Sequence, residues 1–252
     1  MLDVVRIPVL KDNYVWLLRS GDAVAAVDPA VDGPVEDELA ARGWRLTHIL
    51  NTHHHNDHVG ANLVLKARHG LTIVGPRADR DRIPGIDIEV GDGGTYVLGG
   101  AAARVFDVPG HTRGHIAYWF EAEGALFCGD TLFALGCGRL FEGTPAQMWT
   151  SLLKLRALPD ATKVHCAHEY TQSNARFALS VDAGNVALRA RARSVDEARA
   201  AGRATVPSAL GEEKATNPFL RADDPALARA MGFAGRPPAE VFAAIRAAKD
   251  SF

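Results

Sequence analysis

The chain contains the stretch Thr52-His53-His54-His55-Asn56-Asp57-His58, in which four histidines and an aspartate occupy residues 53–58. This stretch follows the apolar pair Ile49-Leu50 and precedes a helical pattern that begins at Ala61. These neighbours predict a loop at the end of a strand, where binding and catalytic groups commonly gather. The stretch therefore marks the region from which a function can be argued.

The residue types in this loop are those of a metal site. His53 and His55 are two residues apart, so in an extended segment their side chains point the same way. Asp57 and His58 follow at the turn into the helix, where their side chains can face a second metal ion. Imidazole nitrogen and carboxylate oxygen suit zinc, iron or manganese, and the absence of cysteine argues against a closed structural zinc site. A hydrogen-bonded histidine-rich turn is the alternative, and the spacing favours metal.

Three further polar residues follow predicted strands. They are His111, after residues 105–110, Asp130, after residues 126–129, and His168, after residues 164–167. Taken singly, they can be interpreted as a turn cap, an Asx-turn and a core histidine. Together they repeat one arrangement, in which a strand delivers a metal-ligand type to a loop.

Composition sets the broad class of the protein. The 252 residues include 47% hydrophobic and 23% charged residues, with a formal net charge of −2, which is typical of a globular protein and gives no sign of nucleic-acid binding. The sequence contains no run of about 18 apolar residues, so no membrane span is predicted. Charged residues near the start predict no export signal. Three cysteines without CxxC spacing predict reduced thiols and a cytoplasmic location.

The first two thirds of the chain alternate short apolar runs with turn residues and helical patterns, which predicts a layered α/β domain. The expected strands are Tyr14–Leu18, Ala23–Val27, His48–Asn51, Thr72–Val74, Arg104–Val108, Ile116–Phe120, Ala125–Cys128 and Lys163–Cys166. The expected helices here are Val35–Arg42, Ala61–His69 and Pro145–Ala157, the last with Thr144 as its N-cap.

After about Thr171 the strand patterns stop and segments rich in alanine, arginine, glutamate and leucine take over. Helices are expected at Asn185–Ala201, Pro225–Met231 and Pro237–Lys249. These predict a smaller helical domain that packs directly on the first. The arginines at positions 189, 191 and 193 are interpreted as a solvated helix face.

The loop at residues 52–58 resembles the T-H-x-H-x-D-H signature of the metallo-β-lactamase superfamily, and the spacing to His111, Asp130 and His168 also matches. Later blocks resemble the glyoxalase II family, the hydroxyacylglutathione hydrolases, and the resemblance covers nearly the whole chain. These blocks are Gly110–His115, Gly129–Phe133, Gly136–Thr144, His168–Thr171, Asn217–Arg221 and Arg246–Asp250.

The resemblance implies a four-layer αββα metallo-β-lactamase sandwich over residues 1–170 and a smaller all-helical domain over residues 171–252 that helps to hold glutathione. It also implies two divalent metal ions, zinc first, with iron or manganese as alternatives. Their ligands would be His53, His55 and His111 for one ion, Asp57, His58 and His168 for the other, and Asp130 for both.

The implied activity is hydrolysis of S-D-lactoylglutathione to D-lactate and glutathione, with Asp57 and Asp130 as catalytic metal ligands. Metal coordination makes hydroxide available at neutral pH, and a thiolate leaves without a dedicated acid. Glutathione would contact Arg139, Phe141, Tyr170, Arg246 and Lys249. Arg139 and Phe141 stand near positions where animal members have Lys and Tyr. Arg139 keeps the positive charge of the lysine but differs in geometry, and Phe141 lacks the hydroxyl of the tyrosine.

Alternatives on the same scaffold remain. A glutathione-persulfide dioxygenase would use one iron, two histidines and one aspartate, whereas Asp57, His58 and the Arg246/Lys249 segment favour the thioesterase. A nuclease would carry a larger inserted domain and a more basic face. We expect a monomer that binds a small-molecule glutathione thioester and neither nucleic acid nor a membrane.

Asp28, His54 and His115 are further candidates. Asp28 is interpreted either as a carboxylate that orients a ligand histidine or as a turn-forming residue before Pro29. His54 and His115 are interpreted as supporting or structural residues and not as direct ligands.

Overall fold

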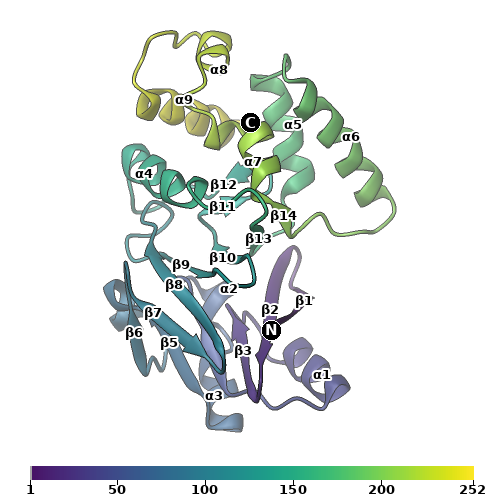
Figure 1. The fold of residues 1–252 in the computed structure, drawn as a ribbon, viewed down its shortest axis with the longest axis vertical. Coiled ribbons are helices and arrows are strands. Elements are labelled where there is room, and N and C mark those ends of the chain that lie inside the picture. Colours follow the sequence, from purple (N-terminus) through teal and green to yellow (C-terminus); the bar gives the residue numbers. More distant parts are fainter. Residues whose placement is uncertain (1) are drawn as a thin grey trace. The chain divides into compact units, whose positions relative to one another are not determined.

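A computed structural model describes residues 2–252 of the chain, which fold as two compact units (Figure 1). The first unit comprises Met1–Asp107 and Arg113–Gly129, and the second comprises Val108–Thr112 and Asp130–Phe252. Among the described residues, no helix is both long enough and apolar enough to span a bilayer.

The first unit contains a six-stranded sheet with the strand order β1-β2-β3-β4-β5-β6. Its first three strands pair antiparallel, and the strands from β3 to β6 pair parallel. Because parallel neighbours need a crossover connection, helices stand between them. The strands are β1 (Asp3–Val9), β2 (Asn13–Ser20), β3 (Ala23–Val27), β4 (His48–Leu50), β5 (Thr72–Pro76) and β6 (Ile88–Val90).

The crossover helices begin just beyond the carboxyl ends of the parallel strands. They are α1 (Gly33–Arg42), α2 (Asn56–Val59), α3 (Asn62–His69) and the 3-10 helix η1 (Arg77–Arg82). The loop at residues 52–58 lies at the carboxyl end of β4, and Asp28 lies at the same end of the neighbouring β3. Ligands commonly bind at this edge of a parallel sheet.

A second set of strands in the first unit forms an antiparallel meander. It consists of β7 (Thr95–Leu98), β8 (Ala101–Asp107), β9 (Ile116–Phe120) and β10 (Ala125–Gly129). This meander packs against the first sheet, because the Trp16 and Phe127 rings lie 6.4 Å apart and the Tyr118 hydroxyl donates to the Asn51 carbonyl at 3.0 Å. The other face of the first sheet is covered by α1 and α3 through Val35, Leu39 and Leu65.

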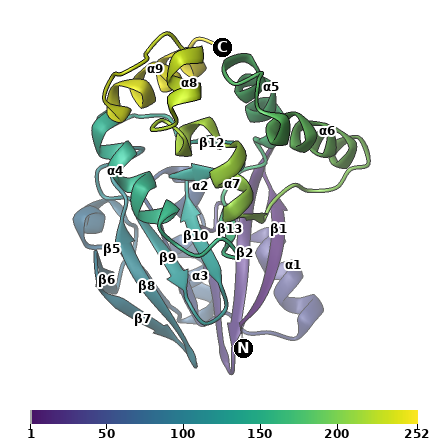
Figure 2. The same cartoon turned by 45° about the horizontal axis from the view of Figure 1, so that its top comes forward.

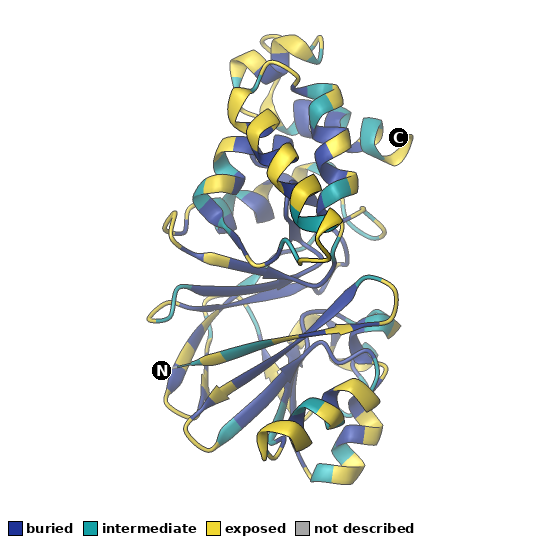
Figure 3. Ribbon diagram, turned by 90° about the vertical axis from the view of Figure 1, so that its right-hand side faces the viewer, coloured by how far each residue is buried: buried dark blue, intermediate teal, exposed yellow. Residues whose placement is uncertain are grey.

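This layering explains the sequence pattern of the central strands. Strand β2 is buried on both faces over Asn13–Leu18, and β3 is buried from Val24 to Val27. Strands covered on both faces read as continuous apolar runs and do not alternate. Figure 3 shows the strands dark blue over most of their length, whereas the helices keep exposed outer faces.

The second unit is mainly helical. It carries the hairpin β11 (Leu132–Phe133) and β12 (Gly136–Cys137), and the antiparallel pair β13 (Lys163–Cys166) and β14 (Ser208–Ala209). Helices α5 and α6 lie side by side (Figure 2). The helices are α4 (Pro145–Arg156), α5 (Thr171–Val181), α6 (Val186–Ala200), α7 (Leu210–Thr216), η2 (Pro218–Leu220), α8 (Pro225–Ala230) and α9 (Pro238–Asp250).

All eight expected strands and all six expected helices are confirmed, with their ends displaced by at most a few residues. Helix α4 begins as predicted, since Thr144 accepts a hydrogen bond from the Gln147 amide in a capping box. Two expectations about the C-terminal part were wrong. Strand structure continues past Thr171 in the short β14, and Arg191 is not on a solvated face.

Arg191 is buried because its guanidinium pairs with the buried carboxylate of Glu213 and donates to Thr216 Oγ1 at 2.7 Å. Its neighbours Arg189 and Arg193 are exposed, as the pattern of charged residues predicted. A periodic run of arginines cannot reveal one buried partner that lies more than twenty residues away.

Candidate metal centre

The histidines of the loop at residues 52–58 converge in the first unit. His53 Nε2 lies 3.1 Å from His55 Nδ1, and the ring centres of His53 and His58 are 4.0 Å apart. His58 Nε2 lies 3.4 Å from Asp57 Oδ2. His53 and His58 are fully buried, whereas His55 and Asp57 are partly exposed. The expected ligands of this loop are therefore close neighbours.

A chain of hydrogen bonds from Asp28 orients His53. Asp28 Oδ1 accepts from the Thr52 amide at 2.7 Å, and Oδ2 accepts from the Thr52 hydroxyl at 2.6 Å. Since that hydroxyl donates to Asp28, it accepts from His53 Nδ1, which lies 3.0 Å away. The ring nitrogen that faces His55 is then the unprotonated one, which is the form a metal requires.

Asp28 also fixes His58. Its Oδ2 lies 3.1 Å from His58 Nδ1, and because a carboxylate only accepts, Nδ1–H donates. This contact directs the other ring nitrogen toward Asp57. Asp28 has a backbone φ of 51°, so it also makes a sharp bend after β3. Both interpretations of Asp28 thus hold, as an orienting carboxylate and as a turn residue.

Asp57 and His54 are held by side chains that sequence reasoning missed. Asn13 Nδ2 donates to Asp57 Oδ2 at 3.0 Å. His54 turns toward η1, where Arg82 donates to its Nε2 at 3.1 Å and its Nδ1–H donates to Asp79 at 3.0 Å. Nothing in the local sequence marks Asn13 or Asp79, because their partners lie 25 to 44 residues away.

His115 packs against one face of the His53 ring. The two rings are stacked, with centroids 4.5 Å apart and an interplanar angle of 17°. His115 Nδ1 lies 3.0 Å from the Ile116 carbonyl, to which it donates. The structure therefore places both His54 and His115 as neighbours of the expected ligands, each with protein partners of its own.

The second unit brings the remaining three expected ligands together. Asp130 lies between two histidines, with Oδ2 3.4 Å from His111 Nε2 and Oδ1 3.4 Å from His168 Nε2. All three side chains are buried. A carboxylate with one oxygen toward each of two imidazoles has the arrangement of a shared ligand.

Backbone and ring contacts orient these histidines. His111 Nδ1 donates to the Arg139 carbonyl at 2.8 Å, which leaves Nε2 toward Asp130. His168 stacks on Tyr170, with ring centres 4.6 Å apart and an interplanar angle of 5°. The ring of Phe133 lies nearly perpendicular to that of His168, with ring centres 5.8 Å apart and an interplanar angle of 89°.

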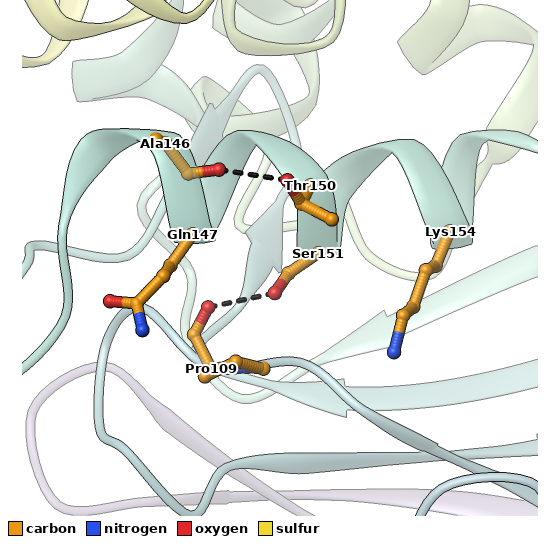
Figure 4. A pocket seen from close by; sticks show the side chains of 6 residues that line it. All are labelled: Pro109, Ala146, Gln147, Thr150, Ser151 and Lys154. Atoms are coloured by element: carbon orange, nitrogen blue, oxygen red, sulfur yellow. Dashed lines mark hydrogen bonds between the residues drawn. The ribbon is translucent and has the colours of Figure 1, made fainter.

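A pocket of about 290 Å³ adjoins the segment that carries His111 (Figure 4). Its wall is formed by α4, and Ser151 Oγ donates to the Pro109 carbonyl at 2.7 Å. This bond ties α4 to the backbone two residues before His111. The pocket is lined by Pro109, Ala146, Gln147, Thr150, Ser151 and Lys154.

The donor atoms available in both units fit divalent metals of intermediate hardness. They are imidazole nitrogens and carboxylate oxygens, which suit zinc, iron and manganese. Burial raises the pKa of the Cys137 thiol to about 11 and that of the Cys166 thiol to about 12, so both stay protonated at neutral pH. A protonated thiol is a poor nucleophile.

The expected substrate-binding residues all lie in the second unit, and their surroundings differ. Asp250 Oδ1 accepts from Arg139 at 3.3 Å and lies 2.9 Å from Arg246 NH2. Arg246 is buried and also donates to the Cys137 carbonyl at 3.0 Å. Arg139 and Phe141 are exposed.

Lys249 and Tyr170 stand apart from the Asp250 contacts. The ammonium of Lys249 lies 3.4 Å from Ser173 Oγ and 5.3 Å from the ring centre of Phe177. Desolvation by burial lowers the pKa of Lys249. Tyr170 is half exposed and presents one ring face to His168. Arg246 thus makes its direct ion pair with Asp250, whereas Lys249 makes its hydrogen bonds with Ser173.

Comparisons with known proteins cover the whole chain. Residues 10–168 match the family model of the metallo-β-lactamase superfamily, and residues 169–252 match that of the hydroxyacylglutathione hydrolase C-terminus. Hydroxyacylglutathione hydrolases of Methylococcus capsulatus and Rhodospirillum rubrum are 62% and 55% identical to it. In each case the match covers 100% of this chain and 99% of the relative.

Solved structures agree on the fold. ETHE1 from Myxococcus xanthus superposes with a TM-score of 0.69 at 24% identity, over 97% of this chain and 89% of that one. The BLEG-1 B3 metallo-β-lactamase superposes with a TM-score of 0.66 at 22% identity, over 87% of this chain and 99% of that one. The expected metallo-β-lactamase fold with a C-terminal helical region is confirmed, and the chain belongs to the hydroxyacylglutathione hydrolase family of that superfamily.

Proposed function

We propose that the protein carries out the reaction of its family, the hydrolysis of a glutathione thioester, with S-D-lactoylglutathione as the substrate and D-lactate and glutathione as products. The observation that carries this proposal is the full-length match to hydroxyacylglutathione hydrolases at up to 62% identity. The paired histidine and aspartate sets of the two units support it, because hydrolysis at neutral pH needs an activated water.

We assign one divalent ion to His53, His55 and His111, and a second to Asp57, His58 and His168, with Asp130 shared by both. Support comes from each unit separately, through the convergence of the loop ligands and the placement of Asp130 between two histidines. Zinc is our first choice, with iron or manganese as alternatives, since nitrogen and oxygen donors accept all three.

The bound ions would supply Lewis acidity and a source of hydroxide at neutral pH. The protein's own groups have other tasks. Asp28 and the Arg139 carbonyl keep ligand imidazoles in the form with Nε2 available. The leaving thiolate has a conjugate acid with a pKa of about 8.5, so the chain needs no general acid. Asp57 then acts as a ligand and not as a free base.

We propose residues 1–170 as the catalytic domain and residues 171–252 as the glutathione-binding domain. Glutathione carries two carboxylates, and charge-assisted hydrogen bonds to Arg139, Arg246 and Lys249 would hold them. Phe141 and Tyr170 would contact the substrate through their partly exposed rings. Asp250 keeps two of these cations together before substrate arrives.

We place the reaction in the cytoplasm and expect a monomer. Among the described residues the three cysteines are free and buried, as in a reducing compartment. The substrate is a small molecule, and a formal net charge of −2 does not favour nucleic acid as a partner.

The test is an assay of thioester loss from S-D-lactoylglutathione, with released glutathione measured by a thiol reagent and bound metal by elemental analysis. Activity should fall after chelation and return with added zinc, iron or manganese. A protein that holds two metals and leaves the thioester intact would contradict the proposal. Oxygen uptake with glutathione persulfide, which we expect to be absent, tests the dioxygenase alternative.

A further inference from the structure

The hairpin β11–β12 of the second unit joins Asp130 to Arg139. At its turn, Leu135 has a backbone φ of 58°, in the left-handed region that leucine rarely adopts. Its side chain is fully buried among small and aliphatic residues of α5 and α6. Unfavourable backbone conformations persist only where the surroundings impose them, and they cluster at functional sites.

Two asparagines hold the carbonyl groups of this turn. Asn217 Nδ2 donates to the Phe133 carbonyl at 3.1 Å and to the Gly136 carbonyl at 3.0 Å. Asn174 Nδ2 donates to the Ala134 carbonyl at 3.0 Å. Both asparagines are buried, so these carbonyls depend on side-chain donors and not on water.

A buried glutamate holds the turn amide. Glu213 Oε2 accepts from the Leu135 amide at 2.9 Å and lies 3.2 Å from Asn217 Nδ2, while Oε1 is paired with Arg191. Glu213 is fully buried, and an ionised carboxylate there is stable only because these donors surround it. We name Asn174, Glu213 and Asn217 the hairpin clamp.

The base of the hairpin meets two of the proposed ligands. The Gly138 amide donates to the Thr131 carbonyl at 3.3 Å, and a β-carbon at Gly138 would stand only 1.9 Å from the Asp130 carbonyl oxygen. Near the turn, the Phe133 ring makes a T-shaped contact with the His168 ring. A shift of the hairpin would therefore displace the Asp130 backbone and a contact of His168.

We propose that the hairpin clamp is a set of positioning residues that holds Asp130 and His168 in their ligand geometry through β11–β12. This inference rests on the proposed function, because it takes Asp130 and His168 as metal ligands. The helical segment after Thr171 then has two tasks, since it binds glutathione and also rigidifies part of the metal site.

The test compares two matched variants, Asn217→Ser and Asn185→Ser. Asn217 caps η2 by accepting from the Phe219 amide at 3.0 Å, and Asn185 caps α6 by accepting from Leu188 at 3.0 Å. Serine keeps a cap but cannot reach the further carbonyls. Asn217→Ser thus loses both hairpin contacts, whereas Asn185→Ser loses contacts that do not involve the hairpin.

In Asn217→Ser we expect metal affinity, measured by chelator competition well below the melting temperature, to fall by about tenfold, as for loss of an outer partner of a metal ligand. The kcat should fall and partly recover with excess metal, while KM for S-D-lactoylglutathione should change less than threefold. Asn185→Ser should keep both kcat and metal affinity, even if its melting temperature falls.

Parental metal affinity in a folded Asn217→Ser protein would overturn the inference, as would an equal loss in both variants. If Asn217→Ser does not fold, Asn174→Ala removes one hairpin contact and should still lower metal affinity by a few-fold; unchanged affinity there would equally overturn it. If the parent protein fails to hydrolyse the thioester, the proposed function fails, and metal affinity alone still decides the role of the clamp.

Discussion

The two ligand-bearing regions of the molecule differ in how they are built. In the first unit, His53, His55, Asp57 and His58 lie within six residues, in one loop and the short helix α2, and polar side chains such as Asp28 orient them. In the second unit, the proposed ligands are spread from residue 111 to residue 168. Backbone carbonyls and aromatic rings orient those ligands, as at His168.

This difference predicts which substitutions should disturb the proposed ligands of each unit. The loop of the first unit depends on a few charge-assisted hydrogen bonds, so single polar substitutions should disturb it. The proposed ligands of the second unit depend on the placement of whole segments, so the side chains that fix those segments matter more.

The largest effect should come from Asp130→Ala, because Asp130 is proposed to serve both ions. Loss of an outer partner of a ligand costs about 10–100-fold in activity or affinity, and loss of a shared ligand should exceed that range. We therefore expect more than a 100-fold fall in kcat and a lower metal content by elemental analysis. A variant with two bound metals and full activity would remove Asp130 from the site.

The next effect tests the polar support in the first unit. Asp28→Asn leaves one acceptor atom where three donors, from the Thr52 amide, the Thr52 hydroxyl and His58, now bind. We expect kcat/KM or metal affinity to fall by about 10–100-fold. Asp79→Asn is the matched control, since Asp79 is equally buried but contacts His54. Equal losses in both variants would show that Asp28 has no special role.

A smaller effect should separate binding from chemistry in the second unit. Contacts made equally in ground and transition states change KM and leave kcat nearly unchanged, and a charge-assisted hydrogen bond is worth roughly 1.5–3 kcal/mol. The double variant Arg246→Ala with Lys249→Ala should therefore raise KM for S-D-lactoylglutathione by at least about tenfold. In the single variant Lys249→Ala, which leaves the contact of Arg246 with the Cys137 carbonyl in place, metal content should not change.

The structure sharpens this prediction for the single variants. Arg246 is buried against the Cys137 carbonyl and Asp250, so Arg246→Ala should also lower the melting temperature. Lys249 makes long hydrogen bonds to Ser173, the shorter of them 3.4 Å to Oγ, so Lys249→Ala should raise KM and leave the melting temperature nearly unchanged. An unchanged KM in a folded double variant would assign α9 a purely structural role, and a small thioester without glutathione serves as the control substrate.

The sequence predicted what depends on local patterns. Ala23–Val27, Ile116–Phe120 and Lys163–Cys166 have the expected strand bounds, because apolar runs between turn residues define buried strands. The ligand loop could be found by composition alone. The proposed ligands of the second unit could be singled out only as a group, from their positions after predicted strands, because no local signal distinguishes Asp130 alone from a turn aspartate.

The rest depends on contacts between distant residues. The hairpin β11–β12 has two residues in each strand, too few for a periodic pattern. Glu213 binds the amide of Leu135, 78 residues away, and in the sequence it is one of two ordinary helix glutamates. Its burial, like that of Arg191, follows from tertiary packing, which overrides the usual exposure of charged residues.

The smallest effect is expected at an ion pair of the second unit that involves no proposed ligand. Arg156 donates from NH1 to Asp223 Oδ1 at 2.7 Å and from NH2 to Oδ2 at 2.6 Å. The hydrogen bond with this guanidinium lowers the pKa of Asp223. Both side chains are about one third exposed, so solvent screening limits the pair to about 1 kcal/mol or less.

The sign of the pH dependence follows from that lowered pKa. A carboxyl group whose folded pKa lies below its unfolded value of about 3.9 stabilises the fold above that pH, and the contribution disappears as pH falls through the folded pKa. Asp223→Asn should therefore lower the free energy of unfolding at pH 7 by at most about 1 kcal/mol, and the difference from the parent should shrink steadily below about pH 5. Urea denaturation at several pH values measures this, with kcat and metal content expected to stay at parental values. A difference that grows toward acid pH, or a loss of metal in Asp223→Asn, would contradict this prediction. It would mean that the Arg156–Asp223 ion pair also helps to position the proposed ligands of the second unit.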